Sequence, residues 1–193
     1  SSVSVTPAGH TYTITPAVLG ITVSAVYNGT TTFTSANAII TTTGLAAWDK
    51  ITNVTVSAAD ANGAASYVTA IAGNTPATAA NTFSSLNYRI NTAYNNTLTG
   101  GLPVNAAQGT ATNQVVITPA PLGVTINAIY SGTSTVTPTS FTVTGLVNSQ
   151  TINSISAAVI NAINVSANNS NYVTALTIGS GTASMANYSL TAT

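Results

Sequence analysis

Hydrophobic and polar residues alternate along short stretches of this 193-residue chain. Between Ile21 and Tyr27 every second residue is apolar and most of the others are polar, and residues 124–130 repeat the alternation. A period of two is typical of a β-strand with one buried face. Asn-Gly and Ser-Gly pairs at residues 28–29 and 131–132 follow these runs, and they predict tight turns at equivalent places.

The chain contains an internal duplication. Residues 14–30 read ITPAVLGITVSAVYNGT, and residues 117–133 read ITPAPLGVTINAIYSGT. Shorter matches follow in the same order, at residues 43–45 and 144–146, 67–70 and 172–175, and 87–88 and 187–188. Self-similarity of this length predicts two homologous modules. We place the modules at residues 13–93 and 116–193, with residues 94–115 as a linker or crossover.

Each module is predicted to be a small antiparallel β-sandwich. Thr-rich runs that end at Gly44 and Gly145, and further alternation at residues 51–56, add strands to the first ones. Many short strands with regular turns favour a sandwich over a helical fold. Residues 59–65 and 157–165 fit either a short helix or a loop.

Residues 1–12 lie outside both modules and have a strand pattern of their own. Val3 and Val5 alternate with Ser and Thr, but the repeat supplies no partner for them. Because an isolated strand is unstable in water, we expect this tail to be frayed, folded back or inserted elsewhere. The chain starts at Ser1 without a basic or apolar leader, and we interpret it as a mature product whose signal has been removed.

The polar positions are almost uncharged, which restricts the chemistry that the chain can perform. Charged residues make up 2 % of it, and the ionisable acids and bases outside tyrosine are Asp49, Asp60, Lys50, Arg89 and His10. Acid–base catalysis, metal binding and nucleic-acid binding need side chains that are mostly missing. We therefore expect no catalytic, cofactor-binding or metal site and no nucleic-acid partner. So few titratable groups also predict a stability that depends weakly on pH.

The few charged residues leave some alternatives open. Asp49 and Asp60 could form a carboxylate pair of the glycosidase type, but the second module has no equivalents, which favours isolated surface residues. His10 lies in the tail, and a lone histidine is a poor metal site. Lys50 could enter a Lys-Asn isopeptide crosslink, although no neighbouring Glu supports one. The chain has no Cys, so disulfides are excluded, and no stretch of about 20 residues is apolar throughout, so we expect no transmembrane span.

Asn-x-Ser/Thr acceptor sites for N-glycosylation are the clearest chemical signal. They occur at Asn28, Asn53, Asn95, Asn164, Asn168 and Asn187. An uncharged surface needs another means of hydration, so we expect N-linked glycans at several of them. Thr clusters at residues 30–32 and 41–43 could suggest an ice-binding face, but their β-propensity explains them more simply.

Tyrosines recur at equivalent positions of the two modules. The pairs are Tyr27 with Tyr130, Tyr67 with Tyr172, and Tyr88 with Tyr188. Tyrosines in β-sandwiches commonly bury their rings and bind backbone groups through their hydroxyls. We therefore interpret them as core or corner residues.

Two known families resemble parts of this chain. The Ile-Thr-Pro-Ala starts, the turn at residues 27–31 and the pairs at 87–88 and 187–188 are similar to the tandem Tyr-Asp-Gly modules of long bacterial surface adhesins, with Asn or Ser in place of the Asp. The whole chain, with two β-modules, almost no charge, many glycosylation motifs and an extra N-terminal strand, more closely resembles the thread filament subunits of thermoacidophilic archaea.

The second resemblance implies immunoglobulin-like, glycosylated domains that join head to tail by donor-strand complementation. Residues 1–12 would then be the donor strand, with Val3, Val5 and Tyr12 as apolar anchors. Strand addition of this kind combines backbone hydrogen bonds with pockets for alternate side chains.

We therefore predict an all-β, non-enzymatic chain with two tandem immunoglobulin-like β-sandwich domains and an N-terminal donor strand. It would polymerise with copies of itself into an acid-tolerant extracellular filament, a pilus or thread at the cell surface. Adhesion to a host or to other cells, or biofilm formation, would be its role. The alternative is a tandem-repeat fragment of a large cell-surface adhesin, and an enzyme is the weakest reading.

Overall fold

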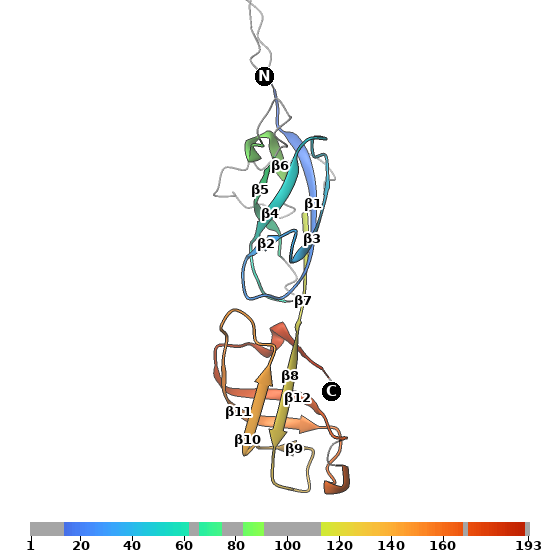
Figure 1. The fold of residues 1–193 in the computed structure, drawn as a ribbon, viewed down its shortest axis with the longest axis vertical. Coiled ribbons are helices and arrows are strands. Elements are labelled where there is room, and N and C mark those ends of the chain that lie inside the picture. Colours follow the sequence, from blue (N-terminus) through green and yellow to red (C-terminus); the bar gives the residue numbers. More distant parts are fainter. Residues whose placement is uncertain (1–13, 62–65, 75–82, 91–112, 168–169, 192–193) are drawn as a thin grey trace, which may run out of the picture. The chain divides into compact units, whose positions relative to one another are not determined.

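The computed structural model describes residues 14–61, 66–74, 83–90, 113–167 and 170–191, and this part of the chain is all-β (Figure 1). It contains thirteen strands and three short 3-10 turns, and no α-helix is present among these residues. The chain divides into two compact units. The first unit contains residues 1–25, 31–58 and 64–116, and the second contains residues 26–30, 59–63 and 117–193.

The first unit contains two sheets. Its strands are β1 (Ala17–Val26), β2 (Thr32–Thr34), β3 (Ala38–Thr43), β4 (Lys50–Val56), β5 (Val68–Asn74), β6 (Tyr88–Ile90) and β7 (Asn113–Thr118). One sheet has the order β3-β1-β6 with β7 also paired to β1, and the other has the order β2-β4-β5. The 3-10 turn η1 (Ser85–Asn87) leads into β6.

The second unit repeats this arrangement. Its strands are β8 (Ala120–Asn127), β9 (Thr135–Val136), β10 (Ser140–Thr144), β11 (Ile152–Ile160), β12 (Val173–Gly181) and β13 (Tyr188–Leu190). The sheets have the orders β10-β8-β13 and β12-β11-β9. Two 3-10 turns, η2 (Val165–Ala167) and η3 (Met185–Asn187), precede β12 and β13.

The duplication in the sequence is therefore also a duplication of strand pairing. Gly20 pairs with Thr43 in β1 and β3, and Gly123 pairs with Thr144 in β8 and β10. The last strand of each repeat, β6 or β13, pairs in parallel with the first three residues of β1 or β8. This parallel pair departs from the predicted wholly antiparallel sandwich. It arises because β5 and β12 lie in the other sheet of each unit. The chain therefore crosses between the sheets before β6 pairs with β1, or before β13 pairs with β8.

A glycine with a positive φ angle turns the chain after β3 and after β10. Gly44 has φ +80° and Gly145 has φ +90°. A Cβ atom on Gly145 would lie 2.5 Å from the carbonyl oxygen of Pro121, and one on Gly44 would clash with the carbonyl oxygen of Val18. The Thr-Gly-Leu match in the sequence thus marks a turn that only glycine accommodates.

Each unit buries apolar side chains from both of its sheets. The largest fully buried side chains are Tyr88, Phe33, Leu19, Ile21, Ile90, Leu122, Val23, Val54 and Val68. Of these, only Leu122 belongs to the second unit. The same sequence pattern therefore produces a more completely closed core in the first unit.

Two sequence predictions differ from the structure in detail. Residues 157–160, which were expected in a helix or loop, belong to β11 because they continue its pairing with β12. Residues 113–115 of the expected linker are the start of β7. The remaining linker residues and the whole of the predicted donor strand, residues 1–12, lie outside the described part of the chain.

Candidate docking groove

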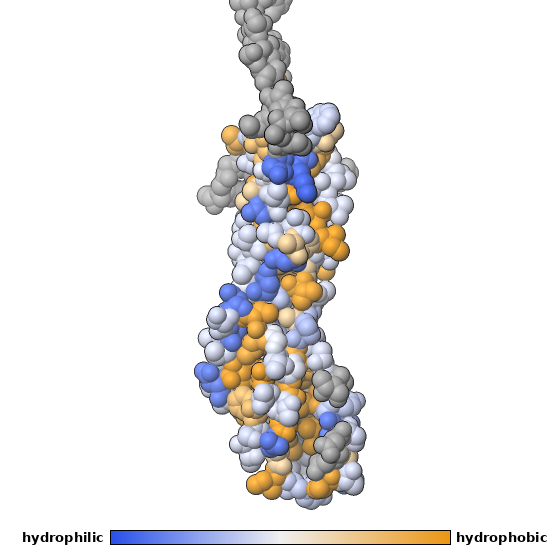
Figure 2. Space-filling model, in the orientation of Figure 1, coloured by the Kyte–Doolittle hydropathy of each residue, from blue (hydrophilic) through white to orange (hydrophobic). Residues whose placement is uncertain are grey.

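A groove of about 590 Å³ opens in the second unit beside β8. Its lining comes from both sheets and consists of Val124, Thr125, Ile126, Asn127, Ala128, Val136, Ile160, Asn171, Tyr172, Val173, Leu190 and Thr191. Figure 2 shows apolar side chains, in orange, at the surface of this unit. The groove thus exposes part of what would otherwise be a sandwich core.

In the first unit, β7 lies at the equivalent place. β7 pairs with β1, and it buries Val115 and Ile117, which are 7 % and 3 % exposed. In the second unit, β8 pairs with β10 and β13, and no further described strand pairs with it. The second unit therefore has every strand of the first except the one that closes its core.

The burial of equivalent residues shows the effect of this missing strand. Val23 and Val68 are fully buried in the first unit. Their equivalents in the repeat, Ile126 and Val173, are only half-buried and line the groove. Because the residue types are nearly the same, the lack of a further described strand beside β8, and not a change of sequence, accounts for the exposure.

Polar groups near the groove also indicate a missing neighbour. In the first unit, the Asn113 side chain accepts a hydrogen bond from the Val68 N–H at 2.9 Å and donates one to the Val68 carbonyl at 3.1 Å. The equivalent Val173 lines the groove. Beside it, the side-chain oxygen of Asn171 is buried without a hydrogen-bond partner among the described residues. Buried acceptors are normally paired, so this oxygen is suited to a donor from an entering strand.

The repeat also identifies a segment with the right pattern for the groove. Ile14-Thr15-Pro16 matches Ile117-Thr118-Pro119, so Ile14 corresponds to Ile117, Tyr12 to Val115 and His10 to Asn113. Ile14 is 79 % exposed, whereas Ile117 is 3 % exposed. The segment before β1 is therefore the sequence counterpart of β7.

A hydrogen-bonded tyrosine cluster lies in the second unit. The rings of Tyr27 and Tyr188 meet edge to face, with centroids 5.5 Å apart. Gln150 joins their hydroxyls, because its Nε2 donates to Tyr27 at 2.6 Å and its Oε1 accepts from Tyr188 at 2.5 Å. The Tyr188 hydroxyl also accepts from the Val147 N–H at 3.2 Å. We call Tyr27, Gln150 and Tyr188 the tyrosine cluster.

The first unit holds the counterpart of two members of this cluster. The Tyr88 hydroxyl donates to Asp49 Oδ2 at 2.5 Å and accepts from the Ala46 N–H at 3.2 Å. Asp49 stands in the repeat where Gln150 stands in the second unit. The ring of Phe83 stacks on Tyr88 with a centroid distance of 6.0 Å.

Burial raises the pKa of Tyr88 and of Tyr188 above the ordinary value of 10.0. For Tyr88, removal of the hydroxyl from water is the main cause, and the hydrogen bond to Asp49 adds to it. For Tyr188, removal from water is again the main cause. Both hydroxyls therefore remain protonated donors at neutral and acid pH.

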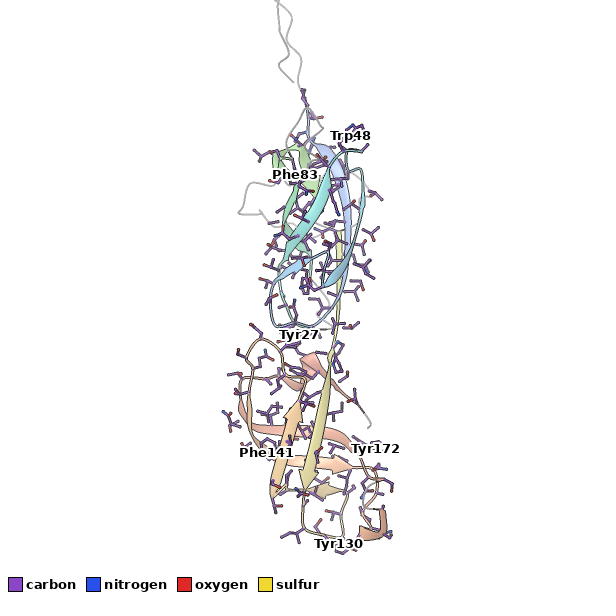
Figure 3. The ribbon with its side chains drawn as sticks, viewed as in Figure 1. Tyr27, Trp48, Phe83, Tyr130, Phe141 and Tyr172 are labelled. Atoms are coloured by element: carbon purple, nitrogen blue, oxygen red, sulfur yellow. The ribbon has the colours of Figure 1, made fainter. Side chains whose placement is uncertain are left out.

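Tyrosines at equivalent positions of the two repeats differ in burial and in hydrogen bonding. The predicted contact of a corner hydroxyl with backbone is confirmed for Tyr88 and Tyr188. The prediction of a core position is wrong for Tyr130 and Tyr172, which are 62 % and 43 % exposed. Tyr172 lines the groove, and Tyr130 lies at the lower end of the second unit in Figure 3.

The charged residues have local hydrogen-bonding roles. Asp49 accepts from Tyr88, and Asp60 Oδ1 accepts from the Asn187 side chain at 3.0 Å. Arg89 Nε donates to the Pro16 carbonyl at 3.4 Å, and Lys50 begins β4. His10 lies outside the described residues.

The glycosylation motifs occupy different environments. Asn164 is exposed, Asn28 and Asn53 are partly exposed, and Asn95 and Asn168 lie outside the described residues. Asn187 is only 4 % exposed. Its Oδ1 accepts from the Ala61 N–H at 2.7 Å, and its Nδ2 donates to Asp60. This candidate glycosylation site therefore makes two side-chain hydrogen bonds in the folded chain.

Two searches of the described residues gave negative findings. No group of three or more His, Cys, Asp or Glu side chains is placed to hold a metal ion among them. Within the same part of the chain, no helix is long and apolar enough to cross a membrane.

Comparison of the chain with protein-family models, with curated proteins and with solved structures found no match.

Proposed function

We propose that this chain is the structural subunit of an extracellular filament, built from two immunoglobulin-like domains. The N-terminal segment of one subunit fills the groove of the second unit in the next subunit. The partner is thus a second copy of the same chain. Repetition of this contact forms a head-to-tail polymer, because a heterologous interface that does not close continues indefinitely.

The observation that carries the proposal is the difference between the two repeats. The first unit has β7 against β1, and the second has a groove beside the equivalent β8. The sequence counterpart of β7 is the segment that precedes β1. One copy therefore has both a segment with the sequence pattern of β7 and a groove of the corresponding kind.

The repeat gives a register for this insertion. Tyr12 and Ile14 take the inward positions that the buried residues Val115 and Ile117 occupy on β7. Val3 and Val5, the other predicted anchors, would lie further along the same strand, on alternate positions. Backbone hydrogen bonds to the open edge of β8 would supply the rest of the contact, as in other cases of strand addition.

The composition suits a polymer that works outside the cell. A chain with 2 % charged residues gains little surface hydration from charge, so N-linked glycans and hydroxyl groups would provide it. Neither these groups nor backbone hydrogen bonds titrate near neutral or acid pH. An acid-tolerant thread or pilus that serves adhesion or biofilm formation fits these properties.

Truncation of the donor segment tests the proposal. Full-length chains should form filaments visible by electron microscopy, and chains lacking residues 1–14 should remain monomeric by sedimentation with an unchanged circular dichroism spectrum. A synthetic peptide of residues 1–16, added in excess, should raise the melting temperature of the truncated chain, because a ligand that binds only the folded state stabilises it.

A point variant provides a more conservative version of the same test. Ile14→Asp should abolish polymerisation, whereas Ile39→Asp should not, because Ile39 is similarly exposed, at 72 %, but lies on β3 away from the proposed donor segment. Polymers that persist after removal of residues 1–14 would contradict the proposal. A monomer that never polymerises in any form would favour the adhesin-fragment alternative.

A further inference from the structure

The groove beside β8 differs from the corresponding part of the first core in one large apolar side chain. Six apolar residues of its lining have equivalents in the first unit, as the repeat and the strand pairing define them. With the residue of the first unit given first, the pairs are Ile21 and Val124, Val23 and Ile126, Phe33 and Val136, Val56 and Ile160, Val68 and Val173, and Ile90 and Leu190. Five of these pairs are identical, isomeric or different by one carbon atom, whereas a valine replaces the ring of Phe33.

Phe33 and Val136 occupy the same place in their sheets. Phe33 on β2 pairs with Val54 on β4, and Val136 on β9 pairs with Ala158 on β11. Phe33 is fully buried in the first core, and Val136 lines the groove. The second unit therefore lacks the volume of an aromatic ring at this position.

The segment before β1 differs from β7 in the opposite sense. Ile14 matches Ile117 without change, but Tyr12 stands where β7 has Val115, which is buried. An aromatic ring is thus missing from the groove and present in the segment that we propose to fill it. Protein interiors are closely packed, so a loss of volume in one part of a core calls for a gain in another.

The polar groups of the two units change together in the same way. A buried tyrosine hydroxyl usually has a hydrogen-bond partner. Asn171 lines the groove, and its Oδ1 atom is buried without a hydrogen-bond partner among the described residues. In the first unit the equivalent residue is Ser66, whose hydroxyl donates to the Ala58 carbonyl at 2.7 Å. An acceptor thus occurs in the unit whose proposed occupant brings a hydroxyl.

Resting on the filament function proposed above, we propose that Tyr12 is the residue by which the groove selects its occupant. The ring of Tyr12 from one copy packs on Val136 of the next copy, in the space that Phe33 fills in the first unit. Its hydroxyl donates to Oδ1 of Asn171. We call Val136 and Asn171 the Tyr12 pocket. A segment with valine at this position, as in β7, leaves the pocket partly empty.

The repeat brings the hydroxyl and its acceptor to the same region of the groove. Asn113 at the start of β7 binds Val68, and the equivalents of these two residues are His10 and Val173. Tyr12 and Asn171 are each two residues from that place, which is about 7 Å along a strand. None of the residues that line the groove is charged, so the pocket suits a neutral phenol.

Complementation between two variant chains tests the fit of the side chains. Chains with Tyr12→Val and chains with Val136→Phe each contain one of the two changes, so each should assemble poorly alone. In a mixture, the valine segment of the first chain can enter the phenylalanine groove of the second chain. The tyrosine segment of the second chain can enter the unchanged groove of the first. The mixture should therefore form filaments in which the two chains alternate.

Sedimentation across a concentration series measures the critical concentration for assembly. Tyr12→Val should raise it about tenfold or more because a cavity remains, and Val136→Phe should do so because the groove is overpacked. The equimolar mixture should assemble at a concentration about fivefold or more below that of either chain alone. Val116→Phe is the matched control, since Val116 is exposed on β7, and it should change the critical concentration less than about threefold.

The melting temperature of each subunit, measured below its critical concentration, separates loss of fit from loss of folding. If Val136→Phe melts at a lower temperature than the parent chain, Val136→Leu replaces it as a smaller enlargement of the same kind. Normal assembly of both single variants, or a mixture of folded chains that assembles no better than its components, would overturn the role of Tyr12. Strand insertion itself would still stand if removal of residues 1–14 abolishes the filaments. Failure of the unmodified chain to form filaments would overturn the proposed function together with the pocket.

A double-mutant cycle tests the hydrogen bond. Tyr12→Phe retains the ring and should raise the critical concentration about threefold to tenfold, the effect of one hydrogen bond. Asn171→Ser introduces the residue that stands in the first unit and removes the acceptor. The double variant should be less impaired than the product of the two single effects, because both changes remove the same interaction. Independent effects, or a loss caused by His10→Ala and not by Tyr12→Phe, would overturn the assignment of the hydroxyl.

Discussion

The side chain of Asn113 binds both backbone groups of Val68, accepting from its N–H at 2.9 Å and donating to its carbonyl at 3.1 Å. The side-chain amide thus makes the two hydrogen bonds that the backbone of a neighbouring strand would otherwise make with Val68 at the start of β5. The first residue of β7 is thus fixed to the opposite sheet. This contact helps to explain why β7 closes the core of the first unit.

Replacement of Asn113 by Ala should destabilise the subunit. Two backbone groups of Val68, which is fully buried, would lose their partners, and each such loss costs about 1–3 kcal/mol. Chemical denaturation followed by circular dichroism measures the change. His10→Ala, at the equivalent position of the N-terminal segment, should leave the stability of the monomeric subunit unchanged. A stable Asn113→Ala variant would show that β7 is held by its apolar residues alone.

Ile117 and Ile14 are equivalent residues of the two repeats, but their replacement by Ala should have opposite effects. Ile117→Ala should mainly lower the stability of the subunit, and Ile14→Ala should mainly weaken assembly. Ile117 is 3 % exposed, so its truncation should cost about 2–5 kcal/mol of unfolding free energy. Ile14 is 79 % exposed, so the stability of the monomer should change by less than about 0.5 kcal/mol.

Assembly should show the reverse order of sensitivity. If Ile14 enters the groove, its truncation removes about 1.5–3 kcal/mol of burial and weakens polymerisation about tenfold to a hundredfold. Sedimentation across a concentration series measures this. Equal sensitivity of assembly to Ile14→Ala and to Ile39→Ala would contradict the register.

The sequence alone allowed prediction of the strand composition, the duplication and the turns that follow β1 and β8. In a half-buried strand such as Ile21 to Tyr27, alternate residues face the core, so the alternation is visible within the sequence of the strand itself. The two hydroxyl-to-backbone contacts of Tyr88 and Tyr188 were also predictable, because their motif lies next to a strand.

The difference between the two repeats was not predictable in this way. Val23 and Ile126 are similar residues in matching strands, and only the distant β7 makes one buried and the other open. Burial that depends on a segment about 90 residues away leaves no local pattern. The repeat nevertheless indicated that the segments before β1 and β8 are equivalent. The match begins at Ile14 and Ile117, and these two residues precede β1 and β8.

Stability should fall at alkaline pH through Tyr88 and Tyr188. Burial raises the pKa of both hydroxyls above 10.0, so between 10.0 and the folded value the unfolded chain has lost protons that the folded chain retains. The unfolding free energy therefore decreases as pH rises through this range, and these two groups add no pH dependence below it. Thermal melts between pH 7 and 12 measure the decline.

Phenylalanine variants identify the responsible residues. Tyr188→Phe should flatten part of the alkaline decline, although it loses stability at neutral pH because Gln150 and Val147 lose a partner. An alkaline decline that is identical in Tyr188→Phe and in the parent chain would assign it to other groups.

Gly145→Ala should destabilise the subunit more than Gly132→Ala does. Both glycines have positive φ angles, +90° and +74°, and this alone costs about 1–2 kcal/mol for alanine. A Cβ on Gly145 would also lie 2.5 Å from the Pro121 carbonyl oxygen, whereas one on Gly132 would lie 4.0 Å from its nearest neighbour. The difference in unfolding free energy between the variants isolates the clash, and equal values would show that β8 moves to relieve it.

Asn187 and Asn87 provide the last matched pair. Asn187 is 4 % exposed and its amide binds Ala61 and Asp60, so Asn187→Ala should cost about 1–3 kcal/mol of unfolding free energy. Asn87→Ala should leave the stability of the monomer unchanged, because Asn87 is exposed. Peptide mapping of native material should find Asn187 without a glycan, because its side chain is buried in the folded chain. A glycan there would mean that the Ala61 N–H binds a different group in native material.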